Sequence, residues 1–435
     1  MSIPILWQDP FSSKKRYKLI SNYFSSFDED QKLALKGQGI NVEFSKPIFD
    51  YAIFLKVLDL SWLGFTISEY LERLNPTLSD RGPSVNFIIN LLFKFFIESG
   101  ATLHKLDLFF SYFTEIKPEI FNSLEQNTQF FSRIQDLSLE IESYLRIENT
   151  ATLFEILIKN TTKISDLKFE GIYPSHEPQL FHTLIPLESQ KNTLQEVIIE
   201  NCYYNAEFEV LNNCKNLEIL RMRGYHPKLS DILNCKISIL EIVDETGFEI
   251  DASTIVQILE QSGELLQRLT IHYFKILNES LLLEAIKSSC PNITYLSISK
   301  IGFSTQLLEI IGNLQKLQFL TLQCIVDIPE ELKIRVKQFA EILPLTLQYL
   351  DLVYNRWLVP YADILLNNCN APLNKLFIYD LGNENNIKAL IEFCIRNRTL
   401  NYVSVFYDWK EKNKLIKKKL EAYTAFGSFN IVVNC

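Results

Sequence analysis

The sequence predicts an α/β fold built as a solenoid, in which parallel strands alternate with helices in successive repeats. Three observations indicate this fold. A short aliphatic pattern typical of a buried strand recurs along most of the 435 residues. From residue 103 onward its copies begin 20 to 31 residues apart, which suits one strand plus one crossover helix. The segments between copies have helical periodicity, as in 253–262, 279–289 and 386–397.

The strand pattern is aliphatic-x-x-aliphatic-x-aliphatic. An early copy, LKVLDL, begins at residue 55. The later copies are LHKLDL (103), IQDLSL (134), ISDLKF (164), LQEVII (194), LEILRM (217), ISILEI (237), LQRLTI (266), ITYLSI (293), LQFLTL (317), LQYLDL (347), LNKLFI (373) and LNYVSV (400). One strand and one helix cannot bury their own apolar faces, whereas stacked copies share a continuous core.

Cysteine and asparagine recur just before the strands, in NNCKNLEIL, SSCPNITYL and NNCNAPLNKL. With these residues, the segment 53–435 resembles the cysteine-containing form of the leucine-rich repeat. The resemblance implies an arc with parallel strands on its concave face and helices on its convex face. We interpret Cys214, Cys235, Cys290 and Cys369 as small buried hydrophobic residues where each helix returns to the sheet. A capping helix is expected at about 410–424, with a lysine-rich outer face; a nuclear-localisation role for these lysines is the alternative.

The opening stretch IPILWQDPF is similar to the C-terminal end of an F-box, as in fungal F-box proteins with leucine-rich repeats. The similarity rests on Pro4, Ile5, Leu6 and Trp7, followed by Asp-Pro-Phe at 9–11. We therefore divide the chain into a residual F-box tail (1–13), a helical linker and N-terminal cap (14–52), and the solenoid (53–435). The first half of an F-box does not precede the tail, so either the chain is a truncated relative or its start lies upstream.

The family resemblance implies a substrate receptor of an SCF-type cullin-RING ubiquitin ligase. In such proteins the F-box binds a Skp-type adaptor and the solenoid holds the protein substrate. We expect adaptor binding only if a complete F-box exists. The alternative is a leucine-rich-repeat scaffold or decoy without an F-box, which binds a partner and recruits no ligase.

Composition excludes several other classes of protein. The net formal charge of −9 argues against nucleic acid or anionic lipid as a general partner. The longest apolar run, 87–97, is too short to span a bilayer, and the N-terminus has no targeting character. The eight cysteines contain no C-x-x-C pair, so reduced thiols are expected. The sequence predicts a cytoplasmic or nuclear protein.

Catalytic and metal-binding motifs are absent from the sequence. It contains no glycine-rich phosphate loop, no H-E-x-x-H and no G-x-S-x-G, so we predict no enzyme activity, no cofactor and no catalytic residue. A metal site at His176 and His182 is disfavoured because no cysteine lies nearby.

Side chains of a strand alternate between its faces, so every second residue of each copy should point out of the concave face. Early copies present acids there (Asp107, Asp136, Glu140, Asp166, Glu170, Glu196 and Glu200). Our candidate partner-binding residues come later and are Arg221, Arg223, Arg268, Tyr295, Phe319, Tyr349, Phe377, Tyr379, Tyr402 and Phe406. Arginine and aromatic residues dominate interface hot spots. The competing interpretation is that the aromatic rings only stiffen the sheet and the acids are only solvated.

Overall fold

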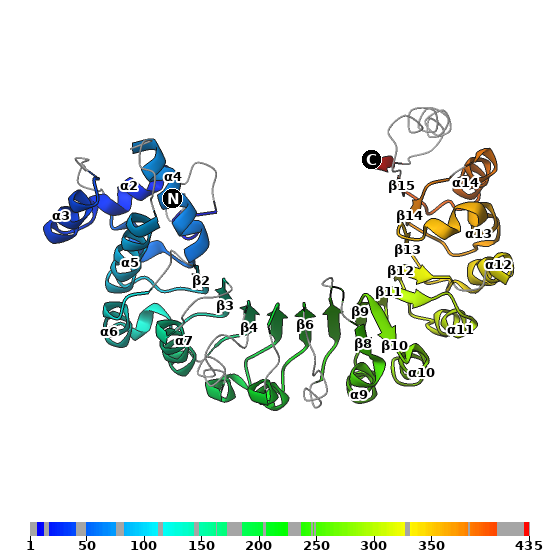
Figure 1. Cartoon of the computed structure of the whole chain (residues 1–435), viewed down its shortest axis with the longest axis horizontal. Helices are drawn as coiled ribbons and strands as arrows, with labels where there is room; N and C mark the ends of the chain where they lie inside the picture. The colour runs from blue at the N-terminus through cyan, green and yellow to red at the C-terminus, as the bar shows by residue number, and fades with distance from the viewer. Residues whose placement is uncertain are drawn as a thin grey trace. The chain divides into compact units, whose positions relative to one another are not determined.

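Each of the thirteen copies of the aliphatic pattern contains a β-strand in the computed structural model (Figure 1). The structure describes residues 7–12, 17–40, 49–74, 82–111, 116–142, 148–161, 163–171, 185–202, 206–224, 236–244, 247, 249–326, 331–381, 383–406 and 430–434. The contacts divide the chain into two units, 1–217 (unit 1) and 218–435 (unit 2), which we describe separately.

Unit 1 contains five parallel strands in the sheet order β1-β2-β3-β4-β5. The strands are β1 (Val57–Asp59), β2 (Lys105–Phe110), β3 (Asp136–Ile141), β4 (Asp166–Glu170) and β5 (Glu196–Glu200). Its helices are α2 (Tyr17–Ser25), α3 (Glu29–Gly37), α4 (Leu60–Leu74), α5 (Gly82–Glu98), α6 (Glu119–Gln126) and α7 (Glu148–Asn160). Its 3-10 helices are η1 (Tyr51–Phe54), η2 (Thr128–Phe130), η3 (Ile185–Gln190) and η4 (Ala206–Asn213).

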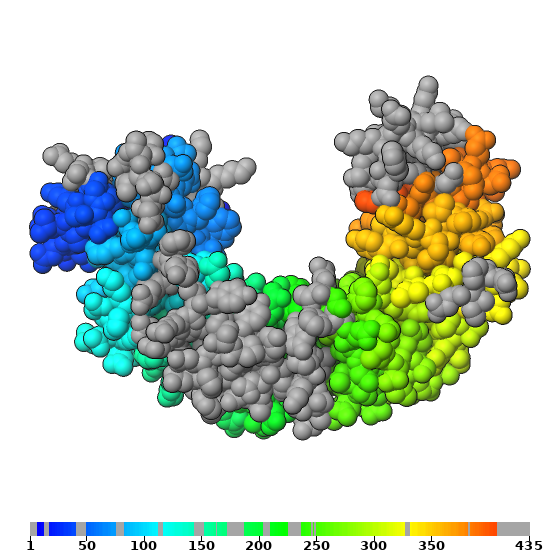
Figure 2. Space-filling model, in the orientation of Figure 1, coloured from blue at the N-terminus to red at the C-terminus, as the bar shows by residue number. Residues whose placement is uncertain are grey.

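Unit 2 continues the same plan with parallel strands in the order β6-β7-β9-β11-β12-β13-β14-β15-β16. They are β6 (Ile219–Arg223), β7 (Ile239–Val243), β9 (Arg268–His272), β11 (Tyr295–Gly302), β12 (Phe319–Ile325), β13 (Tyr349–Leu352), β14 (Lys375–Tyr379), β15 (Tyr402–Phe406) and β16 (Asn430–Asn434). Its helices are α9 (Ala252–Ser262), α10 (Glu279–Ser289), α11 (Thr305–Asn313), α12 (Leu332–Ile342), η7 (Arg356–Tyr361), α13 (Ala362–Asn368) and α14 (Glu384–Arg396). Figure 2 shows the repeats from α11 (yellow) to α14 (orange) as successive layers in contact.

The core of each unit lies between the sheet and its helices. Burial alternates along most of the strands, with β11 and β15 as exceptions. Leu106 and Leu108 of β2 point toward the helices and are buried. Leu220 and Met222 of β6 do the same. The predicted inward and outward positions are therefore confirmed for these strands. An α/β solenoid of stacked strand-helix repeats is the fold of both units.

Buried amide side chains join neighbouring repeats. Asn355 is 1% exposed; its Oδ1 accepts from the Cys324 amide (2.7 Å) and its Nδ2 donates to the Leu322 carbonyl (2.6 Å), both in the preceding repeat. Asn386 is fully buried and donates to the Val359 carbonyl (2.7 Å). Such bonds satisfy backbone groups at the end of β12, beyond its pairing with β13, and in η7.

The described cysteines fill the positions expected of small hydrophobic residues. Cys214, Cys290 and Cys369 are buried as free thiols, and Cys235 lies outside the described residues. Burial raises the pKa of the Cys290 thiol to about 12, which keeps it protonated at neutral pH. A protonated thiol is a poor nucleophile and a poor metal ligand.

The opening residues supply the first hydrogen-bond acceptor of the sheet in unit 1. The Gln8 carbonyl accepts from the amides of Lys56 (2.9 Å) and Val57 (3.0 Å) at the start of β1. The Lys56 carbonyl accepts in the same way from His104 and Lys105 at the start of β2. Gln8 therefore occupies the position of a preceding strand.

Trp7 anchors this segment in the core. It is 4% exposed, its ring stacks on Tyr51 at 4.1 Å between centroids, and it meets Tyr23 edge to face at 5.4 Å. Phe11 is 2% exposed and packs near Tyr23 and Phe96. Pro4, Ile5 and Leu6 lie outside the described residues, and their adaptor role stays a prediction.

Some elements were not predicted from the sequence. A small parallel sheet joins β8 (Glu249–Asp251) to β10 (Lys275–Leu277), and β16 follows β15. The expected capping helix at about 410–424 lies outside the described residues, as do His176 and His182. The boundaries between the three predicted segments remain predictions. Among the described helices, none combines the length and the apolar character that crossing a membrane requires.

Trp7→Ala should destabilise the protein by about 3–5 kcal/mol, because it removes a buried indole and leaves a cavity. Chemical denaturation followed by circular dichroism measures the change. Trp62→Ala is the matched control, since Trp62 is 47% exposed and its removal should cost far less. Equal losses for the two variants would contradict the anchoring role.

Candidate functional site

The side of each sheet that faces away from the helices is called here the open face. Parallel pairing aligns equal positions of successive strands, so their outward side chains form rows across this face. The register of β11 with β12 shifts only between Ser299 and Ile301, C-terminal to the residues that form these rows. In unit 2, Arg268, Tyr295, Phe319 and Tyr349 stand in register on β9, β11, β12 and β13. These rows are the first candidate for a binding surface.

An aromatic ladder crosses the open face of unit 2, formed by Tyr295, Phe319, Tyr349, Phe377 and Tyr402. Successive ring centroids lie 6.1, 5.9, 5.0 and 5.3 Å apart, with interplanar angles between 33° and 41°. The rings are partly exposed, and Phe319 retains 37% of its accessible surface. The ladder therefore both stacks internally and presents apolar surface to solvent.

The ladder shifts sideways at β14. Lys375 occupies the register position between Tyr349 and Tyr402, and Phe377 lies one outward position further along the strand. Tyr379 and Phe406 form a separate pair at 6.0 Å, with the Arg356 guanidinium 5.1 Å from the Tyr379 centroid. Seven predicted aromatic residues thus form one chain of five rings and one pair.

The three predicted arginines make two different kinds of contact. Arg268 is exposed, and its guanidinium lies 4.6 Å from the Tyr295 ring centroid, which extends the ladder by a cation–π contact. Arg221 and Arg223 both bind Glu241, each at 2.7 Å. Although burial alone would raise the pKa of Glu241, hydrogen bonds from Arg223 and Arg221 hold it below its usual value. This half-buried carboxylate partly neutralises the arginine pair. The two arginines were predicted from the sequence, whereas Glu241 was not.

A hollow of about 420 Å³ opens beside the ladder on unit 2. His272, Ser299 and Gln323 line it, together with Tyr354, which has 69% of its surface exposed. The His272 Nε2 lies 2.7 Å from the Ser297 hydroxyl. The hollow adds hydrogen-bonding groups to the apolar ladder.

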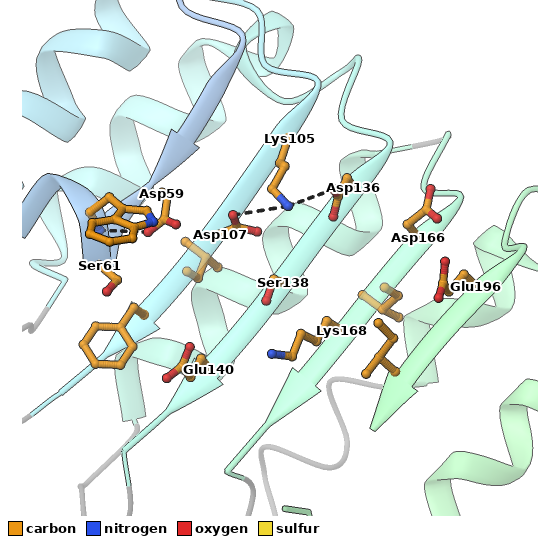
Figure 3. A pocket seen from close by; sticks show the side chains of 15 residues that line it. Asp59, Ser61, Lys105, Asp107, Asp136, Ser138, Glu140, Asp166, Lys168 and Glu196 are labelled. Atoms are coloured by element: carbon orange, nitrogen blue, oxygen red, sulfur yellow. Dashed lines mark hydrogen bonds and ion pairs between the residues drawn. The ribbon is translucent and has the colours of Figure 1, made fainter. Parts of the chain in front are cut away.

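The open face of unit 1 is acidic, whereas that of unit 2 presents aromatic rings and arginines. It carries eight outward carboxylates and two lysines on β1 to β5, a net formal charge of −6. We call it the acidic face, and its carboxylates are Asp59, Asp107, Asp136, Glu140, Asp166, Glu170, Glu196 and Glu200. Lys105 lies between Asp107 (3.4 Å) and Asp136 (3.0 Å), as Figure 3 shows.

A hollow of about 480 Å³ lies over the acidic face (Figure 3). Its lining comes from β1 to β5 and from the start of α4, including Trp62. Burial, followed by the charges of Asp59 and Asp136, raises the pKa of Asp107 to about 6 against the opposing effect of Lys105. Within the described ranges, no group of three histidine, cysteine or acidic side chains converges closely enough to hold a metal ion.

Sequence reasoning found most strand positions of both faces but missed several contributors, among them Trp62, Phe65 and Lys168. Trp62 and Phe65 lie on α4, outside the strand pattern, and are 47% and 56% exposed. Lys168, an outward residue of β4, binds Glu170 (2.5 Å) and Glu200 (3.2 Å). The outward alternation of β4 would have identified Lys168. The role of the predicted residues in binding a partner remains a proposal.

Asp107→Asn should stabilise the protein at pH 7 by about 1–2 kcal/mol and have little effect near pH 4. The folded state holds the Asp107 proton up to about pH 6, above the unfolded value of 3.8, so ionisation disfavours folding. Asparagine cannot ionise, and its advantage should grow as the pH rises from about 4 through 6.

Urea denaturation across this pH range measures the difference between the variant and the parent protein. Glu260→Gln, at an exposed position of α9, is the control and should show no such trend. Destabilisation by Asp107→Asn at pH 7 would contradict the prediction.

Comparisons with known proteins give no family assignment. No family model matches the sequence, and no curated protein matches it. Three solved structures share 12% sequence identity with the chain. One is a chain of the yeast Rad7 and Elc1 complex, with a TM-score of 0.37, covering 94% of this chain and 98% of that one. The others are a Bacteroides fragilis protein (TM-score 0.27; 77% and 74%) and a Leptospira interrogans leucine-rich-repeat protein (TM-score 0.28; 77% and 97%).

Proposed function

We propose that this chain is a non-catalytic protein-binding module that holds a partner on the aromatic ladder of unit 2. The observation that carries the proposal is the ladder itself. Five aromatic rings in succession, flanked by Arg268, stand partly exposed on a rigid sheet. Aromatic and arginine side chains contribute most to interface hot spots, and large apolar patches are uncommon on monomers unless they serve binding.

Stacking between the rings is compatible with this function. The rings meet at tilted angles of 33° to 41° and remain partly exposed, so the same groups that stiffen the sheet can receive a partner. Side chains fixed by both neighbours lose little conformational entropy on binding. A stacked row is therefore a preorganised surface.

For the cellular role, we propose the substrate-recognition subunit of an SCF-type cullin-RING ubiquitin ligase. The support is the resemblance of the opening stretch to the end of an F-box, combined with a leucine-rich-repeat-like solenoid. In this role the ladder would hold the substrate while other subunits transfer ubiquitin. Binding to a Skp-type adaptor would require a complete F-box.

The second candidate is a scaffold or decoy that binds a partner without recruiting a ligase. One observation favours it. Trp7, the aromatic residue of the F-box-like stretch, is 4% exposed and stacked on Tyr51 of the same chain. In this arrangement the indole is a core residue and is not available to an adaptor.

The double variant Phe319→Ala/Tyr349→Ala should weaken partner binding about tenfold or more, because each truncation removes a hot-spot ring. Affinity capture with quantitative mass spectrometry identifies proteins whose recovery falls, and calorimetry with each purified protein measures the affinity. Ile334→Ala, 61% exposed on α12, is the control for loss of exposed apolar surface. Unchanged affinity together with a lower melting temperature would show that the ladder is only structural.

A pull-down with purified Skp-type adaptor separates the two cellular roles. The 435-residue chain is compared with a version extended by any in-frame upstream F-box half. For the ligase role we expect the extended form to bind the adaptor. Failure of both forms, with ladder-dependent capture intact, would establish the scaffold role instead.

A further inference from the structure

The acidic face of unit 1 keeps a surplus of negative charge that its own lysines do not neutralise. Each lysine is shared by two carboxylates, Lys105 by Asp107 and Asp136, and Lys168 by Glu170 and Glu200. The side chain of Glu140, between these two groups, forms no hydrogen bond or ion pair with the described residues. Burial and then the charge of Glu170 raise the pKa of Glu140. The face is therefore complementary to a cationic partner.

The hollow over this face has an aromatic wall. Trp62 lines it, and its ring meets Phe65 edge to face at 6.0 Å between centroids. Phe109 and Ile198, outward residues of β2 and β5, also line the hollow and offer apolar surface. An arginine or lysine side chain fits this combination, because its methylene stem packs on apolar groups and its cation favours an aromatic face.

The carboxylate of Asp107, which lines the same hollow, has one oxygen atom without a hydrogen-bond donor in the described part of the chain. The Asp107 Oδ1 atom is buried and accepts no hydrogen bond from the described residues, whereas its Oδ2 faces Lys105. A buried acceptor without a donor is unfavourable. A guanidinium carries five N–H donors in a planar fork and suits such a carboxylate.

The spread of the carboxylates favours an extended ligand over a single ion. They stand in rows across β1 to β5, and neighbouring strands of a sheet lie about 4.8 Å apart. No three of them converge into a metal site within the described residues. A ligand that satisfies several rows must therefore carry several cationic groups along its length.

We propose that the acidic face binds an extended arginine- or lysine-rich segment of a partner protein, with one cationic side chain in the hollow beside Trp62. The inference rests on the proposed protein-binding function. It uses residues of unit 1 alone, so the acidic face and the aromatic ladder can be tested separately.

The probe is a synthetic peptide of about twelve residues that alternates arginine with serine, a length that spans several strands. A peptide with glutamate in place of arginine is the control ligand. Isothermal titration calorimetry at low and high salt measures affinity, and tryptophan fluorescence reports on the hollow. We expect binding of the arginine peptide only, weakened by salt, with a fluorescence change that Trp62→Phe abolishes.

Two pairs of substitutions test the location of the site. Asp136→Asn/Asp166→Asn and Glu140→Gln/Glu170→Gln should each weaken binding about tenfold. Glu260→Gln/Glu284→Gln removes the same charge from exposed positions of α9 and α10 and should change affinity less than about twofold. Phe319→Ala/Tyr349→Ala should leave peptide binding intact, which separates this inference from the ladder.

Three results would overturn the proposal. The first is no binding of the arginine peptide at low salt. The second is equal weakening by the control pair, which would mean attraction to the overall negative charge. The third is self-association in sedimentation experiments that the acidic-face variants abolish, which would assign the face to a second copy of this chain.

Discussion

A shared backbone carbonyl at the start of each strand sets the register on which the rest of each unit depends. The Gln135 carbonyl accepts from both the Ser165 and Asp166 amides, and the Gln318 carbonyl accepts from both Gln348 and Tyr349. The arrangement recurs at successive repeats in both units. A slip of one residue would turn every inward leucine toward solvent, so the apolar core and these bonds enforce the same register.

Because the register is fixed, outward side chains at equal positions of neighbouring strands interact with one another. A side chain meets its counterpart on the next strand about 4.8 Å away, so repeated acids repel and repeated aromatic rings stack. Both units relieve repulsion in the same way, with one opposite charge between two like charges. Lys168 stands between Glu170 and Glu200, and Glu241 stands between Arg221 and Arg223. In unit 1 this relief is incomplete, because eight carboxylates face two lysines.

The sequence was sufficient to predict the strands and their inward positions because both follow from a local period of two. The same information placed Tyr295 and Phe319 on one face. It did not reveal that Lys375 interrupts the row and Phe377 continues it, because that depends on which residues of distant repeats face each other. The exposure of Trp62 was also beyond prediction, since it depends on how α4 packs. The small sheet of β8 and β10 has strands of three residues, too short for a clear period.

The stacked sheet suits the proposed binding of a partner, because it presents outward side chains on a rigid surface. Each interior strand is held by two neighbours, so its outward side chains are presented without the ordering cost that a loop would incur. A substitution on the open face changes the chemistry of a row while the leucines behind it keep the register. The same backbone can therefore carry an acidic face in one unit and an aromatic ladder in the other. In the proposed binding role, an outward residue acts together with the residues that are aligned with it on the neighbouring strands.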